Sequence, residues 1–286
     1  MEIGIGLPTT IPGVKGSEVI EWAKRAEDAG FSCLGTIDRL GYANYEPFIA
    51  LAAAAAVTER IALTTAIAIL PYRLNTAVVA KQAATIQDLS GGRLVLGVAV
   101  GGRPDDFEAG GAPFEGRGRR LEEMLDDMKR IWAGEERGFA GAIGPDVSAN
   151  PPRILVGGQV DAAFRRAAEY GDGWISGGGP PEMFGDSRAK VEAAFRDAGR
   201  SERPIVSTLS YFSLDADPES QAQATLGDYY SFMPEYAGMV VAGAVKSEGE
   251  VKERVRVFAE QGCDELILFP SSSDPGQVDK LAAAVL

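Results

Sequence analysis

Residues 60–70 read RIALTTAIAIL, residues 76–89 read TAVVAKQAATIQDL, and residues 90–100 read SGGRLVLGVAV. The first and last stretches contain nearly continuous apolar runs, as expected for parallel strands that are buried on both faces. The middle stretch has the length and periodicity of a helix, and Ser-Gly-Gly provides the turn into the second strand. A strand, a crossover helix and a parallel strand in this order predict an α/β fold.

The same alternation extends in both directions along the chain. Six further apolar runs predict strands at residues 3–8, 33–38, 154–156, 173–176, 205–214 and 265–269. Helical patterns lie at residues 17–30, 46–58, 121–132, 160–170, 180–199 and 278–286, and residues 218–262 contain at least two more helices. Ser17 is the expected N-cap of the first helix and Gly30 its end. Residues 134–152, rich in Gly and Pro, predict a loop excursion.

Eight strand–helix units over residues 1–286 predict a single α/β domain, a (β/α)₈ TIM barrel. The alternative is a two-domain Rossmann protein. That fold would require a GxGxxG turn after an early strand, and the sequence contains none.

Composition restricts the class of protein further. A hydrophobic content of 45% suits a globular core, and a formal net charge of −13 argues against a nucleic-acid partner. The sequence shows no secretory signal and no apolar stretch long enough to span a bilayer, so we expect a cytoplasmic protein with no membrane partner. The two cysteines, Cys33 and Cys263, form no CxxC motif and are expected to be buried.

The chain has no histidine. This excludes Ser-His-Asp and Cys-His catalysis, HExxH zinc sites and His₂-carboxylate iron sites, and we expect no metal. No predicted strand carries the lysine of a Schiff-base aldolase, and the strand ends lack an obvious carboxylate pair for a glycosidase. Asp105-Asp106 is interpreted as a solvated loop. A bound cofactor is therefore the simplest source of chemistry.

In barrel enzymes the site lies where strands run into their following loops. Three such loops are glycine-rich: Gly101-Gly102-Arg103, Gly157-Gly158-Gln159 and Gly177-Gly178. Glycine allows backbone amides to approach a phosphate, and Arg103 adds a charge-assisted contact. Ordinary tight turns would use the same glycines. The aromatic residues Tyr42, Tyr45, Tyr211 and Phe212 indicate either an apolar substrate pocket or core packing.

The predicted helix around residues 47–57 has almost no polar face. A barrel helix normally shows one side to water, so this composition predicts a homodimer interface. Tight packing of small residues within one chain is the alternative.

Several motifs resemble the luciferase-like monooxygenases. The segments that carry the resemblance are residues 27–31 with 36–39, 58–63, 70–73, 80–85, 89–98, 114–123 and 171–175. The motif match covers residues 1–180, and the remainder agrees in topology.

The resemblance implies a barrel that binds reduced FMN or the deazaflavin coenzyme F420, often as a homodimer. By position, Ala66 and Ile67 match the bulge that supports the flavin ring, a peptide that is non-prolyl cis in deazaflavin-dependent members. The three glycine loops match those that hold the tail and phosphate of the cofactor.

One position departs from the family pattern: many members have Asp-His where this chain has Asp38-Arg39. Arginine remains charged and only donates hydrogen bonds, so we expect Arg39 to stabilise an anion. Asp38, Tyr72 and Glu46 are the candidates for proton transfer. A structural ion pair between Asp38 and Arg39 is the alternative.

Three functions follow as hypotheses. The first is a flavin-dependent monooxygenase that uses reduced FMN and O₂ on a small organic substrate, with a separate flavin reductase as its partner. The second is an F420-dependent hydride-transfer oxidoreductase, and the third is a non-catalytic flavin carrier. The sequence does not identify the substrate.

Overall fold

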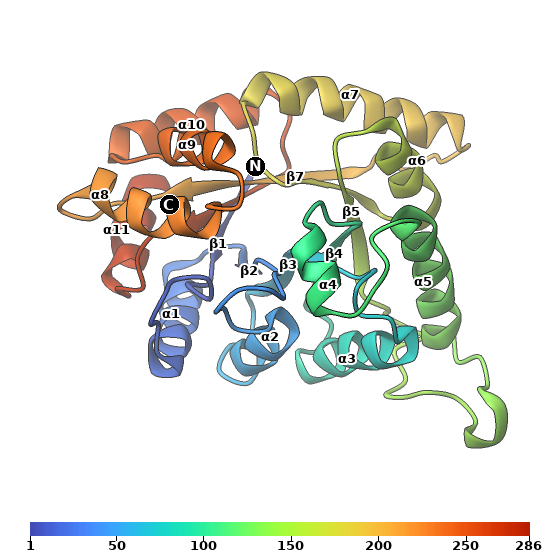
Figure 1. Cartoon of the computed structure of the whole chain (residues 1–286). Coiled ribbons are helices and arrows are strands. Elements are labelled where there is room, and N and C mark those ends of the chain that lie inside the picture. Colours follow the sequence, from blue (N-terminus) through green and yellow to red (C-terminus); the bar gives the residue numbers. More distant parts are fainter.

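Eight apolar runs pair in sequence order into one closed parallel barrel in a computed structural model of the chain (Figure 1). The structure describes residues 1–286, apart from the side chain of residue 140. The strands are β1 Glu2–Gly6, β2 Cys33–Thr36, β3 Ala62–Ile69, β4 Leu94–Ala99, β5 Arg153–Gly157, β6 Gly173–Ser176, β7 Ile205–Phe212 and β8 Glu265–Pro270. The TIM-barrel prediction is confirmed.

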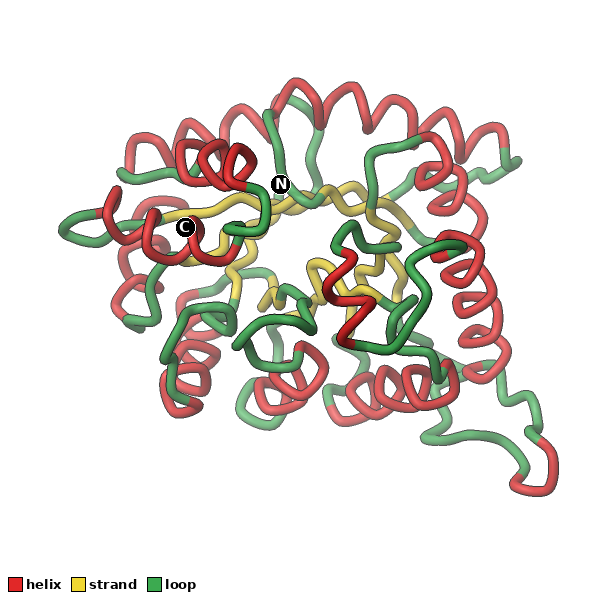
Figure 2. The backbone as a smooth tube through the Cα atoms, in the orientation of Figure 1, coloured by secondary structure: helices red, strands yellow, loops and turns green.

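Helices surround this barrel on the outside, as the tube in Figure 2 shows. They are α1 Gly16–Ala29, α2 Pro47–Ala55, α3 Thr76–Leu89, α4 Pro104–Ala109, α5 Arg117–Trp132, α6 Asp161–Tyr170, α7 Pro181–Asp197, α8 Pro218–Ala222, α9 Pro234–Gly243, α10 Glu248–Glu260 and α11 Gly276–Val285. A π-helical turn at Gln223–Gly227 joins α8 to the segment before α9, so the predicted helical region does divide into several pieces.

Two local expectations are wrong. The N-cap of α1 is Lys15 rather than Ser17, because the Glu18 carboxylate accepts a hydrogen bond from the Lys15 amide and closes the first turn earlier. Asp105 and Asp106, interpreted as a solvated loop, lie instead in the first turn of the short helix α4, which Pro104 begins. Gly30 does end α1, with a left-handed φ of 97°.

The interior of the barrel is narrow, and glycines make room for one large ring. A Cβ at Gly6 would lie 2.1 Å from the ring of Phe269, and one at Gly35 would lie 2.8 Å from it. Both positions therefore have to lack a side chain so that Phe269 can fill the barrel. The outward faces of the strands pack on the helices through side chains that are almost fully buried, including Trp22, Leu51, Leu63 and Phe258.

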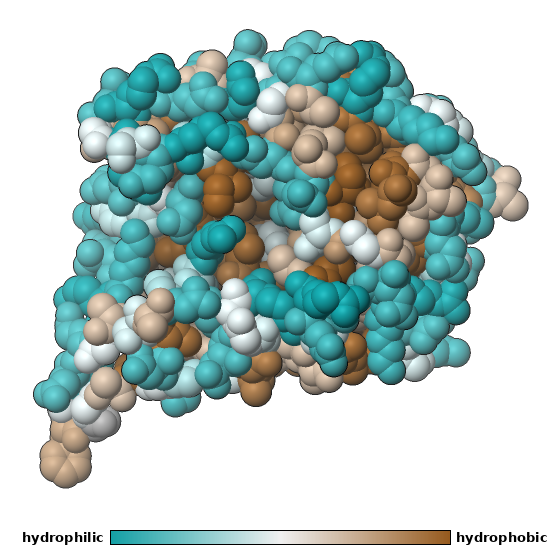
Figure 3. Space-filling view, turned by 180° about the vertical axis from the view of Figure 1, so that it is seen from behind, coloured by the Kyte–Doolittle hydropathy of each residue, from teal (hydrophilic) through white to brown (hydrophobic). Residues whose placement is uncertain are grey.

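The excursion at residues 134–152 projects from the body of the molecule (Figures 1 and 3). It contains the short η1 turn Gly138–Ala140 and one antiparallel bridge between Glu136 and Ala142. The excursion leaves the end of α5 and returns to the start of β5, so it lies at the amino-terminal ends of the strands. It does not contribute to the opposite end, where the candidate site lies.

Candidate active site

All residues predicted for the site follow the carboxyl ends of β2 to β6, except Ala66, Ile67 and Gly157, which lie within β3 and β5. Because every strand of a closed parallel barrel points the same way, these residues surround one mouth. Figure 1 looks onto this mouth, with α4 in front of the strands.

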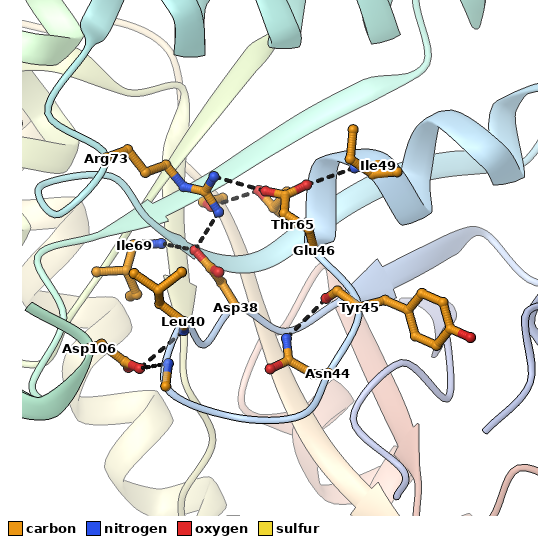
Figure 4. Close-up of polar contacts among 12 residues, drawn as sticks. Asp38, Leu40, Asn44, Tyr45, Glu46, Ile49, Thr65, Ile69, Arg73 and Asp106 are labelled. Atoms are coloured by element: carbon orange, nitrogen blue, oxygen red, sulfur yellow. Dashed lines mark hydrogen bonds and ion pairs between the residues drawn. The ribbon is translucent and has the colours of Figure 1, made fainter. Parts of the chain in front are cut away.

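Asp38 forms the centre of a buried polar network (Figure 4). Its side chain is 2% exposed, and its Oδ2 accepts hydrogen bonds from the Ile69 amide at 2.8 Å and from Arg73 Nη2 at 3.0 Å. Arg73 also donates to Glu46 Oε1 at 2.8 Å. Glu46 in turn caps α2, since its Oε2 accepts from the Ile49 amide. The network therefore joins the loops after β2 and β3 to the start of α2.

Tyr72 lies beside this network. Its ring packs edge to face on Phe107 at 6.0 Å, and its hydroxyl is buried without a hydrogen bond of ordinary geometry. Burial raises the pKa of Tyr72, and the negative charge of Asp38 raises it further. The hydroxyl therefore keeps its proton at neutral pH.

Arg39 belongs to a second network and not to that of Asp38. Its Nη2 lies 2.5 Å from Asp105 Oδ2, its Nε lies 3.6 Å from Asp106 Oδ1, and its Nη1 donates to the Tyr229 carbonyl at 3.1 Å. The alternative of an Asp38–Arg39 ion pair is therefore wrong, because the two side chains have different partners. Arg39 is 7% exposed, so it stands inside the protein and not in open solvent.

Asp106 anchors this second network. Its Oδ1 accepts the amides of Leu40 at 3.0 Å and Gly41 at 2.6 Å, and its side chain is 4% exposed. Burial raises the pKa of Asp106, although the Gly41 amide and Arg39 act in the opposite direction. Asp106 is therefore not solvated, in contrast to the prediction: the short helix α4 turns it inward to fasten the loop after β2.

A segment from the β7–β8 connection reaches these two loops. We call residues 228–232 the aromatic segment, since it contains Tyr229, Tyr230 and Phe232. Arg103 Nη1 donates to the Tyr229 carbonyl at 3.3 Å, and the Arg103 guanidinium lies 3.7 Å from the centre of the Phe232 ring. Arg39 and Arg103 thus share one carbonyl and hold the aromatic segment at the mouth.

The aromatic segment is also fixed by two hydroxyl contacts. Tyr230 and Tyr211 share a hydrogen bond of 2.6 Å between their hydroxyls, and the Tyr42 hydroxyl donates to Asp228 at 2.5 Å. Of the four aromatic residues expected near the site, Tyr42 and Tyr211 therefore contact this segment. Phe212 is fully buried in the outer core, and Tyr45 donates to the Val14 carbonyl.

The β3 bulge lies where it was expected. The register between β3 and β4 shifts between Thr65 and Ala68, and the Ala66–Ile67 peptide is cis. Ala66 is buried in the barrel interior, and the Ile67 side chain extends to Gly157, where a Cβ would lie 2.8 Å from it. The barrel interior is therefore apolar at the bulge.

The glycines of the three loops have different environments. Gly101 is packed, since a Cβ there would lie 2.6 Å from Ile69 and its carbonyl accepts from Arg117 at 2.9 Å. Gly102 and Gly177 face open space, with nothing within 4 Å of a Cβ. Gly158 has a φ of 126°, which favours glycine.

Gln159 connects two of the glycine loops. Its Nε2 donates to the Gly178 carbonyl at 3.2 Å and to Ser176 Oγ at 3.3 Å. Val160 is the N-cap of α6, and its side chain accepts no hydrogen bond from the first backbone amides of that helix. The loop after β5 is therefore held beside the loop after β6.

These features fit a flavin-type cofactor. Gly102 and Gly177 leave open space at the ends of β4 and β6, and the bulge at Ala66 and Ile67 places apolar side chains beside it. The loop at Gly158 and Gln159 precedes a helix N-terminus, the arrangement that binds phosphate. Among the described residues no group of three His, Cys, Asp or Glu side chains is arranged to hold a metal.

Sequence reasoning missed Arg73, Asp106 and the aromatic segment. Arg73 was within the Leu70-Pro71-Tyr72-Arg73 motif, but the motif alone does not show which carboxylate it contacts. The run Tyr229-Tyr230-Ser231-Phe232 was a visible signal, yet it lay in a region interpreted only as helical.

No helix of the described chain has both the length and the apolar character to cross a membrane.

Comparisons with known proteins agree with this architecture. A family profile described as luciferase-like monooxygenase matches residues 1–265. An uncharacterized protein of Mycobacterium tuberculosis is 34% identical over 211 residues, which cover 64% of this chain and 73% of that protein. The F420-dependent hydroxymycolic acid dehydrogenase of Mycobacterium tuberculosis is 27% identical over 295 residues, covering 96% of this chain and 77% of that protein.

Solved structures show the same fold. An F420-dependent secondary alcohol dehydrogenase superposes with a TM-score of 0.81 at 19% identity, covering 99% of this chain and 98% of that one. The monooxygenase RslO1 from Streptomyces bottropensis superposes with a TM-score of 0.77 at 23% identity, and the match covers 100% of this chain and 98% of that one. With the family profile spanning most of its length, the chain belongs to the luciferase-like monooxygenase family of oxidoreductases.

Proposed function

We propose that this protein transfers hydride between the deazaflavin coenzyme F420 and a small organic substrate. The observation that carries the proposal is the resemblance over 96% of the chain to a dehydrogenase named as F420-dependent. The open glycine positions and the apolar bulge at the mouth support a flavin-type ring there. We therefore prefer the deazaflavin hypothesis to the FMN monooxygenase that was the first hypothesis from the sequence.

When bound, the deazaflavin supplies hydride chemistry without using O₂. Ala66 and Ile67 would support its ring, and the loops at Gly158–Gln159 and Gly177–Gly178 would hold its phosphate. Arg39 and Arg103 hold the aromatic segment over the mouth, which limits the access of water. Asp38 is a positioning residue in this proposal, because its carboxylate fixes the end of β3 two residues beyond the bulge.

Hydride transfer to a carbonyl also requires a proton. Tyr72 keeps its proton at neutral pH and lies next to Asp38, and we assign it as the group that holds the proton. Tyr72→Phe should then lower turnover of a ketone while leaving cofactor affinity unchanged. An equal loss of ketone turnover and of cofactor affinity would contradict the assignment.

A pair of titrations tests which cofactor the protein binds. The purified protein is titrated with F420 and with FMN, and the quenching of cofactor fluorescence is followed. Binding of F420 at least tenfold tighter than FMN, followed by its reduction or oxidation with a panel of alcohols and ketones, supports the proposal. Tight FMN binding with O₂-dependent product would favour the monooxygenase instead. Bound flavin that is never turned over would favour the carrier.

A further inference from the structure

Phe139 lies at the tip of the excursion at residues 134–152, and its side chain is fully exposed. A single exposed apolar side chain needs no explanation in itself. This one, however, belongs to a segment that extends past the body of the molecule, as Figure 3 shows. Residues 138–145 at this tip also contain no charged residue, although 24% of the chain is charged. An uncharged projection that carries an aromatic ring is typical of a contact surface.

The base of the excursion is fixed, so its tip is held in position. The Arg137 amide donates to the Gly141 carbonyl at 2.8 Å, and Arg137 Nη2 donates to Asp127 Oδ1 on α5 at 2.5 Å. On the returning half, Val147 is buried in the core that surrounds the barrel. Ordering of this segment therefore adds little to the cost of binding a partner.

Both ends of the excursion are attached to α3. Where it leaves α5, Trp132 Nε1 donates to the Ala80 carbonyl at 3.0 Å, and where it returns, Gln87 Nε2 donates to the Asn150 carbonyl at 2.9 Å. Figure 1 shows the excursion extending beyond α3, on the side of the molecule that carries α2 and α3. The projecting ring of Phe139 and the outer surfaces of these two helices therefore lie on the same side.

The outer surface of α2 and α3 is apolar and carries no net charge. We call its large exposed apolar side chains, which are 49–65% exposed, the apolar face: Ile49 on α2, Leu74 before α3, and Val78 and Leu89 on α3. Residues 47–58 contain no charged residue, and the charged residues of α3, Lys81 and Asp88, are of opposite sign. Since each copy of the chain has a net charge of −13, two copies can approach closely only through a surface of this kind.

We propose that two copies associate through their apolar faces, and that the excursion of each copy buries Phe139 on the apolar face of the other. A two-fold dimer brings the same patch of both copies together, so a projection and an apolar face on one side of the chain contact each other twice. The chain itself thus provides both the exposed ring and an uncharged surface to cover it, which favours a second copy over an unrelated protein. This association does not depend on which cofactor the barrel binds.

Sedimentation velocity of the full chain over a concentration series measures the dissociation constant of the dimer. Phe139→Ala should raise this constant at least about tenfold, because truncation of a buried aromatic residue is among the costlier changes at an interface. The free energy of unfolding of the monomer should stay unchanged, since the ring is exposed within its own chain. Met239→Ala, at a position of α9 that is 66% exposed, is the control and should leave the dissociation constant unchanged. An unchanged constant in Phe139→Ala, or a monomeric wild type, would overturn the inference.

A cross-linking experiment locates the contact. Phe139→benzoylphenylalanine keeps an aromatic ring at the tip and adds a photoreactive ketone. The variant is mixed at low concentration with isotopically labelled wild type, concentrated and irradiated, so that a bond between copies joins a light peptide to a heavy one. Mass spectrometry should find position 139 linked to heavy peptides from residues 47–58 or 74–89. Links within one copy only, links to another surface of the second copy, or no links at all would overturn the inference.

Discussion

Asp38 and Arg39 are neighbours in sequence but belong to different networks. The backbone after β2 directs Asp38 toward Arg73 and the end of β3, and Arg39 toward α4 and the aromatic segment. Two adjacent residues thus fasten the loop after β2 in two directions. The departure from the Asp-His pattern of the family therefore places a structural cation at the mouth and removes a titratable imidazole.

Asp38→Asn tests the first network. The substitution keeps the shape but removes the charge that Arg73 contacts, so we expect a loss of about 2 kcal/mol in the free energy of unfolding. Urea denaturation measures it. Asp126→Asn, in the exposed pair with Arg130, is the control and should change stability by less than about 0.5 kcal/mol. Equal effects of the two substitutions would show that burial of the Asp38 pair does not matter.

A substitution at Gly177 tests whether the cofactor binds in the mouth of the barrel. It faces open space and its φ lies outside the left-handed region, so Gly177→Val should fold with a stability within about 1 kcal/mol of the wild type. The added side chain would fill the space expected for the cofactor, and F420 should bind at least about tenfold more weakly. Gly238→Ala, at an open position of α9, is the control for cofactor affinity. Unchanged F420 binding in Gly177→Val would place the cofactor elsewhere.

At the scale of elements, the short helix α4 holds Arg39 in place at the mouth of the barrel. Pro104 begins the helix, and its first turn then presents Asp105 and Asp106 to Arg39. Asp106→Asn would retain a neutral acceptor for the Leu40 and Gly41 amides but weaken the hold on Arg39. We expect faster limited proteolysis in the aromatic segment, followed by mass spectrometry of the fragments. Unchanged cleavage there would show that Arg103 alone holds the segment.

The surface of α2 and α3 retains large exposed apolar side chains, among them Ile49 on α2 and Val78 on α3, which are 63% and 49% exposed. Ile49→Glu should leave the free energy of unfolding of the monomer unchanged and dissociate the expected homodimer, because a buried unpaired carboxylate is costly. Sedimentation velocity measures the oligomeric state, with Leu286→Glu as a control at another exposed position. A monomeric wild type would contradict the dimer prediction.

At the scale of the whole molecule, the buried groups that respond to high pH are several tyrosines together with Cys33 and Cys263, whose pKa values burial also raises. Burial raises the pKa of Tyr230 to about 12 from its usual value of 10, and the pKa values of four further tyrosines are also raised by burial: Tyr42, Tyr72, Tyr211 and Tyr229. An unfolded chain would release these protons from pH 10 upward, whereas the folded chain would retain them.

Stability should therefore fall as pH rises from about 10 to 12, by up to about 1.4 kcal/mol per pH unit for each such tyrosine. Urea denaturation between pH 8 and 11 measures this, and absorbance at 295 nm reports phenolate. In the native protein the phenolate signal of the buried tyrosines should appear only with unfolding. Titration of all tyrosines near pH 10 in the folded state would contradict the expectation.

The sequence by itself determined the barrel, because apolar runs, helical periodicity and Gly turns are local properties that each segment carries alone. It also located the bulge at Ala66 and Ile67 through motif resemblance. Only the tertiary structure decided which charges meet: Arg73 with Asp38, Asp106 with the loop after β2, and two arginines on the Tyr229 carbonyl. These partners are 35 to 190 residues apart in the chain, and no local pattern encodes a contact that depends on how the barrel closes.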